Sequence, residues 1–269
     1  MVLVDPAGLV TLAAAAAYLV MDARVRRAGG RGVSPGRRWT FLVGIGVLLA
    51  ALIGPVDAAV ATSFSAHMIQ HLMLTMVAAP LLLMGTPITL ALRAWPGAPR
   101  RRLLGAIRSR PARLVAHPLV AWSAFFAVIW GSHLTGVYDA ALQSEALHAA
   151  EHVTYLAAAL LFWMPVVGAD PAPSVLSYPA RILYLFCAMP AMAFLGLALL
   201  SANHALYATY ARAEGGAAAL ADQHTAGAIM WAGTMFLVVP ALAAVLLDWM
   251  RADDREAARL DARTAVHAR

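Results

Sequence analysis

The sequence predicts an all-α membrane protein that crosses the bilayer with seven helices. Two observations support this prediction: long apolar runs alternate with short charged connections, and the arginines gather in every second connection. Hydrophobic residues make up 62% of the chain and charged residues only 13%, whereas about a quarter of the residues of a soluble protein are charged. We expect a single membrane domain over residues 1–250 and a charged cytoplasmic tail over residues 251–269.

Seven apolar segments of suitable length for a span follow one another along the chain. Helices are expected there, because each backbone polar group inside the hydrocarbon core must be paired locally. Four prolines lie within or near the ends of segments and are expected to kink them: Pro80, Pro165, Pro190 and Pro240. The segments cover residues 6–21, 39–56, 64–84, 118–134, 146–167, 182–202 and 223–247.

The arginines predict the orientation in the membrane. All 20 basic residues are arginines, and seven spans would place them on one side, in the first, third and fifth connections and the tail, with the exception of Arg212. By the positive-inside rule, the N-terminus is then outside and the C-terminus inside. The net charge of +6 therefore reflects topology, and no nucleic-acid partner is expected.

Two pairs of histidines define the candidate functional site. His67 and His71 open the third segment, and His148 and His152 open the fifth, both at the predicted outer edge. A spacing of four residues puts both imidazoles of a pair on one face of a helix. Seven of the nine histidines are expected on this outer side, so the two pairs have further imidazoles near them.

Metal binding is the chemistry that this arrangement favours. Neutral imidazole is the commonest protein ligand for late first-row ions, and nearby carboxylates fix its tautomer. The expected ligands are histidines at the outer helix ends: His67, His71, His133, His148 and His152. The carboxylates expected to orient these ligands or to line the access to them are Asp57, Asp139 and Glu151.

The residue types near the pairs are compatible with copper and disfavour other centres. Imidazole mixed with methionine suits copper, although most of the nearby methionines are expected to fill the core. Cys187 is the single cysteine, which excludes a multi-cysteine site, and we expect it to be a small core residue. The stretch from His67 to His71 lacks the glutamate of a zinc-protease helix, so hydrolysis is disfavoured.

Several motifs occur in order over roughly residues 40–250. They are His67-Met68-x-Gln70-His71, Ala79-Pro80, Gly85-x-Pro87, His117-Pro118, His133 with Tyr138-Asp139, His148-x-x-Glu151-His152, Asp222-Gln223 and Ala226-Gly227-x-x-Met230-Trp231. With these motifs the chain resembles the CtaG family of cytochrome c oxidase (caa-type) assembly factors, the kind with seven helices. The resemblance implies a bacterial plasma-membrane protein, not an enzyme, that delivers or inserts copper into a haem-copper oxidase at the outer face.

The resemblance also extends the expected site and names its partners. It implies roles beside the metal for Gln70 and Asp222, which stand at matching motif positions. His204 and His224 have no clear counterpart and are not expected as shared ligands. The implied partners are the lipid bilayer, cytochrome c oxidase subunits and other copper chaperones.

Three alternatives remain open from the sequence. The first is a haem-binding membrane protein that moves electrons, with histidines from two helices as axial ligands. The second is a proton or ion conductor, which the lack of charged residues in the inner halves of the segments disfavours. The third is a scaffold that clamps oxidase subunits and holds no metal.

Overall fold

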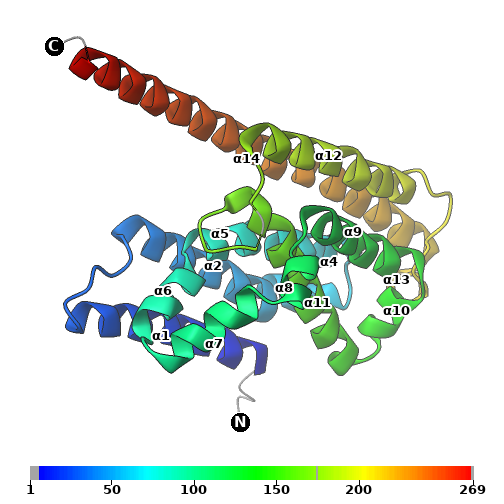
Figure 1. The fold of residues 1–269 in the computed structure, drawn as a ribbon. Helices are drawn as coiled ribbons and strands as arrows, with labels where there is room; N and C mark the ends of the chain where they lie inside the picture. Colours follow the sequence, from blue (N-terminus) through cyan, green and yellow to red (C-terminus); the bar gives the residue numbers. More distant parts are fainter. Residues whose placement is uncertain (1–5, 174, 268–269) are drawn as a thin grey trace.

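A computed structural model describes residues 6–173 and 175–267. Every regular element in these residues is a helix, which confirms the all-α class, and the helices form an elongated bundle (Figure 1). The elements are α1 (Pro6–Arg27), α2 (Pro35–Ile53), α3 (Pro55–Val60), α4 (Phe64–Leu72), the π-helix η1 (Met73–Ala78), α5 (Ala79–Met84), α6 (Pro87–Ala94), α7 (Ala98–Ile107), α8 (Arg110–Val115), α9 (Pro118–Leu134), α10 (Val137–Leu142), α11 (Glu145–Val167), α12 (Tyr178–Leu200), α13 (Ala208–Glu214) and α14 (Gly216–His267).

Among the described residues, six helical stretches are long and apolar enough to cross a membrane, and they correspond to six of the seven predicted segments. The remaining segment is α9, which has the predicted bounds but only 17 residues. At 1.5 Å per residue it is about 25 Å long, a little less than the roughly 30 Å of a hydrocarbon core. The count of seven spans therefore stays a prediction.

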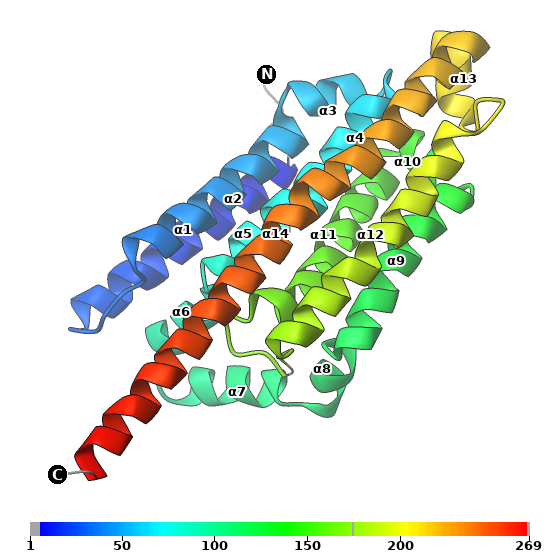
Figure 2. The same cartoon turned by 90° about the horizontal axis from the view of Figure 1, so that it is seen from above.

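The two ends of the bundle differ in character (Figure 2). At one end lie α3, α10 and α13 together with the first turns of α4 and α11, which carry the histidine pairs; we call it the histidine end. Across the other end lie α7 and α8, which carry five arginines and bury no residue; we call it the arginine end. Helix α1 begins at the histidine end, whereas α14 ends beyond the arginine end.

The third predicted helix is interrupted by a π turn in front of Pro80. The Ala79 N–H bonds to the carbonyl of Leu74, five residues back, and proline has no N–H to offer. The carbonyl of Thr75 therefore has no donor from its own helix, and the indole Nε1 of Trp163 donates to it at 2.9 Å. The irregular turn thus fastens the histidine-bearing helix to α11.

At the arginine end, two carboxylates fasten the helices. Asp22 of α1 accepts hydrogen bonds from the Arg26 and Arg38 side chains and from the Val33 backbone N–H. Asp170 accepts from the backbone N–H groups of Ile88 and Thr89, at the start of α6, at 3.0 and 2.8 Å. Each of the four carboxylate oxygens thus has a donor.

Helices α12 and α14 cross closely at two glycines. A Cβ atom added to Gly227 would lie 2.7 Å from the carbonyl oxygen of Gly196, so only glycine permits this approach. Beyond the crossing, α14 runs on as one helix through the predicted charged tail and projects from the bundle (Figure 1). Residues 268–269 of that tail lie outside the described residues.

One predicted core residue is placed differently by the structure. Cys187 is exposed on α12, because the face of α12 that carries it points away from α14. The expectation that it is a small core residue was wrong, since an apolar run in a membrane helix has faces for lipid as well as for protein.

Candidate metal centre

Two helix starts place the histidine pairs. The Ser63 hydroxyl caps α4 by accepting from the Ala66 N–H at 3.2 Å, and the Ser144 hydroxyl caps α11 by accepting from the Leu147 N–H at 3.4 Å. Serine at this position accepts from a donor that has no partner within the helix. Each histidine pair therefore begins within about one turn of a capped helix start, at the histidine end.

The two pairs face each other across the α4–α11 contact. Ring centroids within the pairs are 4.3 Å apart for His67 and His71 and 4.2 Å for His148 and His152. Between the pairs, the ring centroids are 5.1 Å apart for His67 and His148 and 6.0 Å apart for His71 and His152. The structure thus brings together four of the five predicted ligands.

Glu151 of α11 lies beside the histidine pair of α4. Its Oε2 is 3.8 Å from Nε2 of His67 and 3.9 Å from Nε2 of His71. The Glu151 side chain is only 4% exposed. The predicted role of this carboxylate beside the ligands is consistent with its position, and its oxygens are near enough for Glu151 itself to act as a ligand.

Two overlapping groups of three residues could hold an ion. In one, the ring nitrogens of His67, His71 and His152 lie within 4.8 Å of one another; in the other, ligand atoms of His67, His148 and Glu151 do so. His67 belongs to both groups. Three donors from two helices can converge on one late first-row ion, and imidazole suits copper.

Buried atoms without protein partners support this interpretation. Among the described residues, the buried atoms that lack a hydrogen-bond partner include Nε2 of His67, both ring nitrogens of His71, Nε2 of His148 and both oxygens of Glu151. Burying such groups unpaired costs about 1–3 kcal/mol each. Their concentration in one cluster fits a site that a metal ion would complete.

Gln70 orients one of the imidazoles. Its side-chain Nε2 donates to the Ala51 carbonyl at 2.8 Å and to Oδ1 of Asp57 at 2.9 Å. The Gln70 oxygen is then the acceptor for Nε2 of His152, at 3.0 Å. His152 must donate from Nε2, which leaves the lone pair of Nδ1 for a metal. Asp57 and Gln70 thus form a chain of hydrogen bonds that ends on the imidazole of His152.

Tyrosines close the cluster on its remaining sides. The Tyr210 hydroxyl lies 3.1 Å from Nδ1 of His67, and the Tyr155 ring lies 4.1 Å from that of His71. Tyr138 is fully buried, with its ring 4.6 Å from His67. Burial raises the pKa of the Tyr138 hydroxyl well above its ordinary value, so this hydroxyl stays protonated.

A tyrosine near the predicted end of a membrane helix is typical of the aromatic belt at the membrane surface, but Tyr138 is instead buried beside the cluster. The sequence did not single out Tyr155 or Tyr210 at all. Tyr155 follows Glu151 by four residues, so its helix face could have been inferred from spacing. Tyr210 lies 143 residues from His67, and no local pattern connects them.

His133 lies near the cluster but not in either group of three. Its Nδ1 is 2.8 Å from the Ile129 carbonyl of its own helix, and its ring is 5.0 Å from Tyr138. Its buried Nε2 has no hydrogen-bond partner. Tyr138 contacts both His133 and His67, so the fifth predicted ligand is a neighbour of the four rather than a member of their cluster.

Two predicted acids bind backbone groups at helix starts instead. Asp139 accepts from the N–H groups of Ala208 and Thr209 in the first turn of α13, each at 3.1 Å. Asp222 accepts from the Ser65 N–H at 3.1 Å, at the start of α4. Both carboxylates thus hold the elements around the cluster.

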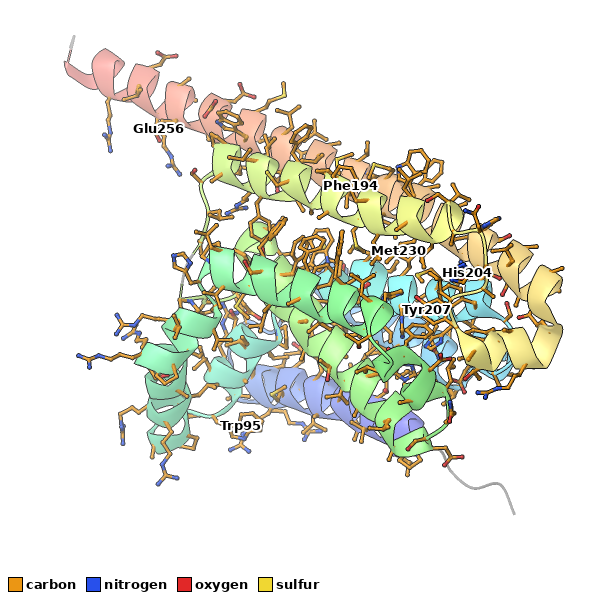
Figure 3. The ribbon with its side chains drawn as sticks, turned by 90° about the vertical axis from the view of Figure 1, so that its right-hand side faces the viewer. Trp95, Phe194, His204, Tyr207, Met230 and Glu256 are labelled. Atoms are coloured by element: carbon orange, nitrogen blue, oxygen red, sulfur yellow. The ribbon has the colours of Figure 1, made fainter. Side chains whose placement is uncertain are left out.

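The remaining histidines of the histidine end lie outside both groups of three. His204 is exposed on the connection between α12 and α13, near the buried Tyr207 (Figure 3). His224 is partly buried, and its Nε2 lies 2.9 Å from the Ala202 carbonyl.

Comparison with known proteins identifies the family. A family model described as cytochrome c oxidase caa3 assembly factor (Caa3_CtaG) matches residues 16–252. The chain is 33% identical, over 96% of its length, to uncharacterized proteins of Mycobacterium bovis and Mycobacterium tuberculosis, and it spans 40% of each of them. An uncharacterized protein of Mycobacterium leprae is 33% identical over 91% of this chain, which spans 38% of that protein. No solved structure matches significantly. The chain therefore belongs to the cytochrome c oxidase caa3 assembly factor family.

Proposed function

We propose that this protein binds copper in the cluster between α4 and α11 and passes it to a haem-copper cytochrome c oxidase during assembly. The observation that carries the proposal is the set of buried, unpaired ligand atoms on His67, His71, His148 and Glu151. Family membership supplies the oxidase as the client. Because the chain spans only 40% of two curated relatives, the client and the cargo are proposals for this chain itself.

The proposal includes seven spans in a bacterial plasma membrane, with the N-terminus and the histidine end outside. It is supported by the start of α1 and the end of α14 at opposite ends of the bundle (Figure 2) and by the arginines of α7 and α8, which the positive-inside rule places in the cytoplasm. Copper would then be handled at the extracytoplasmic face.

The packing of the cluster disfavours haem. A haem with two axial histidines needs space for its macrocycle between their rings. The rings of His67, His71, His148 and His152 instead approach one another at 4.2 to 6.0 Å, and Tyr155 packs on His71 at 4.1 Å. A metal ion fits between such rings and a porphyrin does not.

Metal content tests the proposal. The purified wild-type protein is loaded with cuprous ion and its bound copper is counted by elemental mass spectrometry, beside a His71→Ala, His148→Ala double variant. The matched control is His204→Ala, which removes an exposed histidine outside the cluster. We expect about one copper in the wild type and the control and a loss of at least tenfold in the double variant. A folded wild type that binds no copper contradicts the proposal and favours a metal-free scaffold.

A further inference from the structure

A lateral pocket reaches the cluster from the side of the bundle. Its volume is about 390 Å³, and it is formed by α9, α10 and the start of α11, which lie side by side in Figure 2. Val137 and Leu147, both in its wall, are 57% and 51% exposed, so the pocket opens on the outside of the bundle. Its inner wall includes Glu151 and Tyr155, which also border the cluster.

Small residues form much of this wall. They include Ala127 and Gly131 of α9 and Ala140 of α10. Small side chains let the backbone of another helix come close in a membrane. A Cβ added to Gly131 would meet no atom within 4 Å, so the space in front of this glycine is unfilled.

Glu151 is the polar group of the wall that lacks a partner. The Ser132 hydroxyl bonds to Tyr155 and to the Ile129 carbonyl, and the Thr154 hydroxyl donates to the Ala150 carbonyl. Both oxygens of Glu151 are buried without a hydrogen-bond partner, although the side chain is only 4% exposed. The pocket thus ends on an unpaired carboxylate that also belongs to one of the two possible metal groups.

We propose that this pocket is the docking site of a membrane-embedded helix of the copper acceptor, which brings its own metal ligand to Glu151. This inference rests on the proposed copper function. The wall is otherwise apolar or internally paired, so a bare ion would have no ligands along it. An acceptor helix that fills the pocket supplies the missing ligand and excludes water at once.

Transfer by this route is a ligand exchange. Each bond from copper to Glu151 or a histidine that breaks is replaced by a bond to the acceptor, and no electron moves. The α4 side of the cluster offers no such route, because His67 and His71 are 0% and 3% exposed and the tyrosines pack against them.

A variant that fills the pocket tests copper transfer to the oxidase separately from copper binding by this protein. In Gly131→Leu the new side chain occupies the pocket, and the matched control is Gly46→Leu, an exposed glycine of α2 whose Cβ would also meet no atom within 4 Å. In cells, the copper bound to the purified assembly factor and the copper in the purified oxidase are both measured. We expect Gly131→Leu to keep its copper while oxidase copper falls at least fivefold, and Gly46→Leu to match the wild type.

Each result decides a different question. Normal oxidase copper with Gly131→Leu overturns the docking site and leaves the copper function standing. A wild type without copper overturns the proposed function itself. If Gly131→Leu loses its own copper, Ala127→Leu fills the pocket from farther along α9; loss of bound copper in both variants would make the pocket part of the binding site and overturn the inference.

A crosslink identifies the occupant. A photoreactive residue at Leu147, in the pocket wall, is compared with one at Leu183, which is 62% exposed on α12. We expect Leu147 to give a covalent adduct with a membrane subunit of the oxidase, identified by peptide mass spectrometry, and Leu183 to give none. Adducts with lipid alone at Leu147 would overturn the proposal.

Discussion

The carboxylates at the histidine end and at the arginine end differ in whether their oxygens have hydrogen-bond donors. Asp22 and Asp170, at the arginine end, have a donor for every oxygen. Glu151, at the histidine end, has a donor for neither oxygen, and unpaired ring nitrogens of His67, His71 and His148 belong to the same cluster. A paired carboxylate holds helices together, whereas an unpaired one costs stability that only a ligand can restore. This difference indicates that the arginine end stabilises the fold, and it supports our proposal that the histidine end binds copper.

The largest expected effect concerns the arginine end. Asp22→Ala leaves the Val33 N–H and two guanidinium groups without their acceptor, so we expect a loss of about 3 kcal/mol of folding free energy. Copper bound per folded molecule should not change. Thermal unfolding in detergent measures the first quantity and elemental analysis the second. Asp248→Ala, which removes an exposed pair with Arg251, is the control and should have little effect.

Glu151→Gln makes the matching test at the histidine end. The amide keeps the shape of the side chain but removes the negative charge, so we expect the affinity for cuprous ion to fall tenfold to a hundredfold, as for partners of metal sites. The unfolding temperature should stay the same or rise, because a buried carboxyl group whose oxygens have no hydrogen-bond partner is gone. Competition with a chromophoric chelator measures the affinity. A large drop in unfolding temperature with unchanged copper affinity would make this end structural too.

Gln70→Leu tests a residue of the histidine end that is not itself an expected ligand but bonds to one, His152. His152 loses the acceptor that fixes its tautomer, and we expect copper affinity to fall about tenfold. The same chelator competition measures this change on the folded fraction. Gln143→Leu, an exposed glutamine whose bond to Thr209 is 3.4 Å long, serves as control. Equal affinities in both variants would show that the tautomer of His152 does not matter.

The smallest effect is expected for Tyr210→Phe. This change removes the hydroxyl that bonds to His67 and donates to the Val60 carbonyl, which should cost about 1 kcal/mol of stability and lower copper affinity severalfold. Tyr184→Phe removes a hydroxyl bonded to the Phe162 carbonyl and should cost the same stability. Only Tyr210→Phe should change copper binding. An equal change in Tyr184→Phe would show that the effect does not depend on contact with the histidine cluster.

Spacing along the helices predicted a good part of the site. The histidine pairs at 67/71 and 148/152 were placed on facing helices because four-residue spacing fixes a helix face, and α9 has the bounds that its apolar run predicted. Asp139 and Asp222 could not be resolved this way, since an acid at a helix mouth has the same local pattern whether it caps a helix or supports a ligand. The contact of Tyr210 with His67 depends on long-range packing and has no local signal.

The π turn in front of Pro80 has a mechanical consequence. It leaves the Thr75 carbonyl to the indole of Trp163, so this bond joins η1 to α11 away from the cluster, while the bond between Gln70 and His152 joins α4 to α11 at the cluster. If the two helices move apart at the histidine end, the hydrogen bond from Trp163 to Thr75 must either break or become the point about which they rotate. In the second case the two histidine pairs would move apart while the helices stay joined near the π turn in front of Pro80.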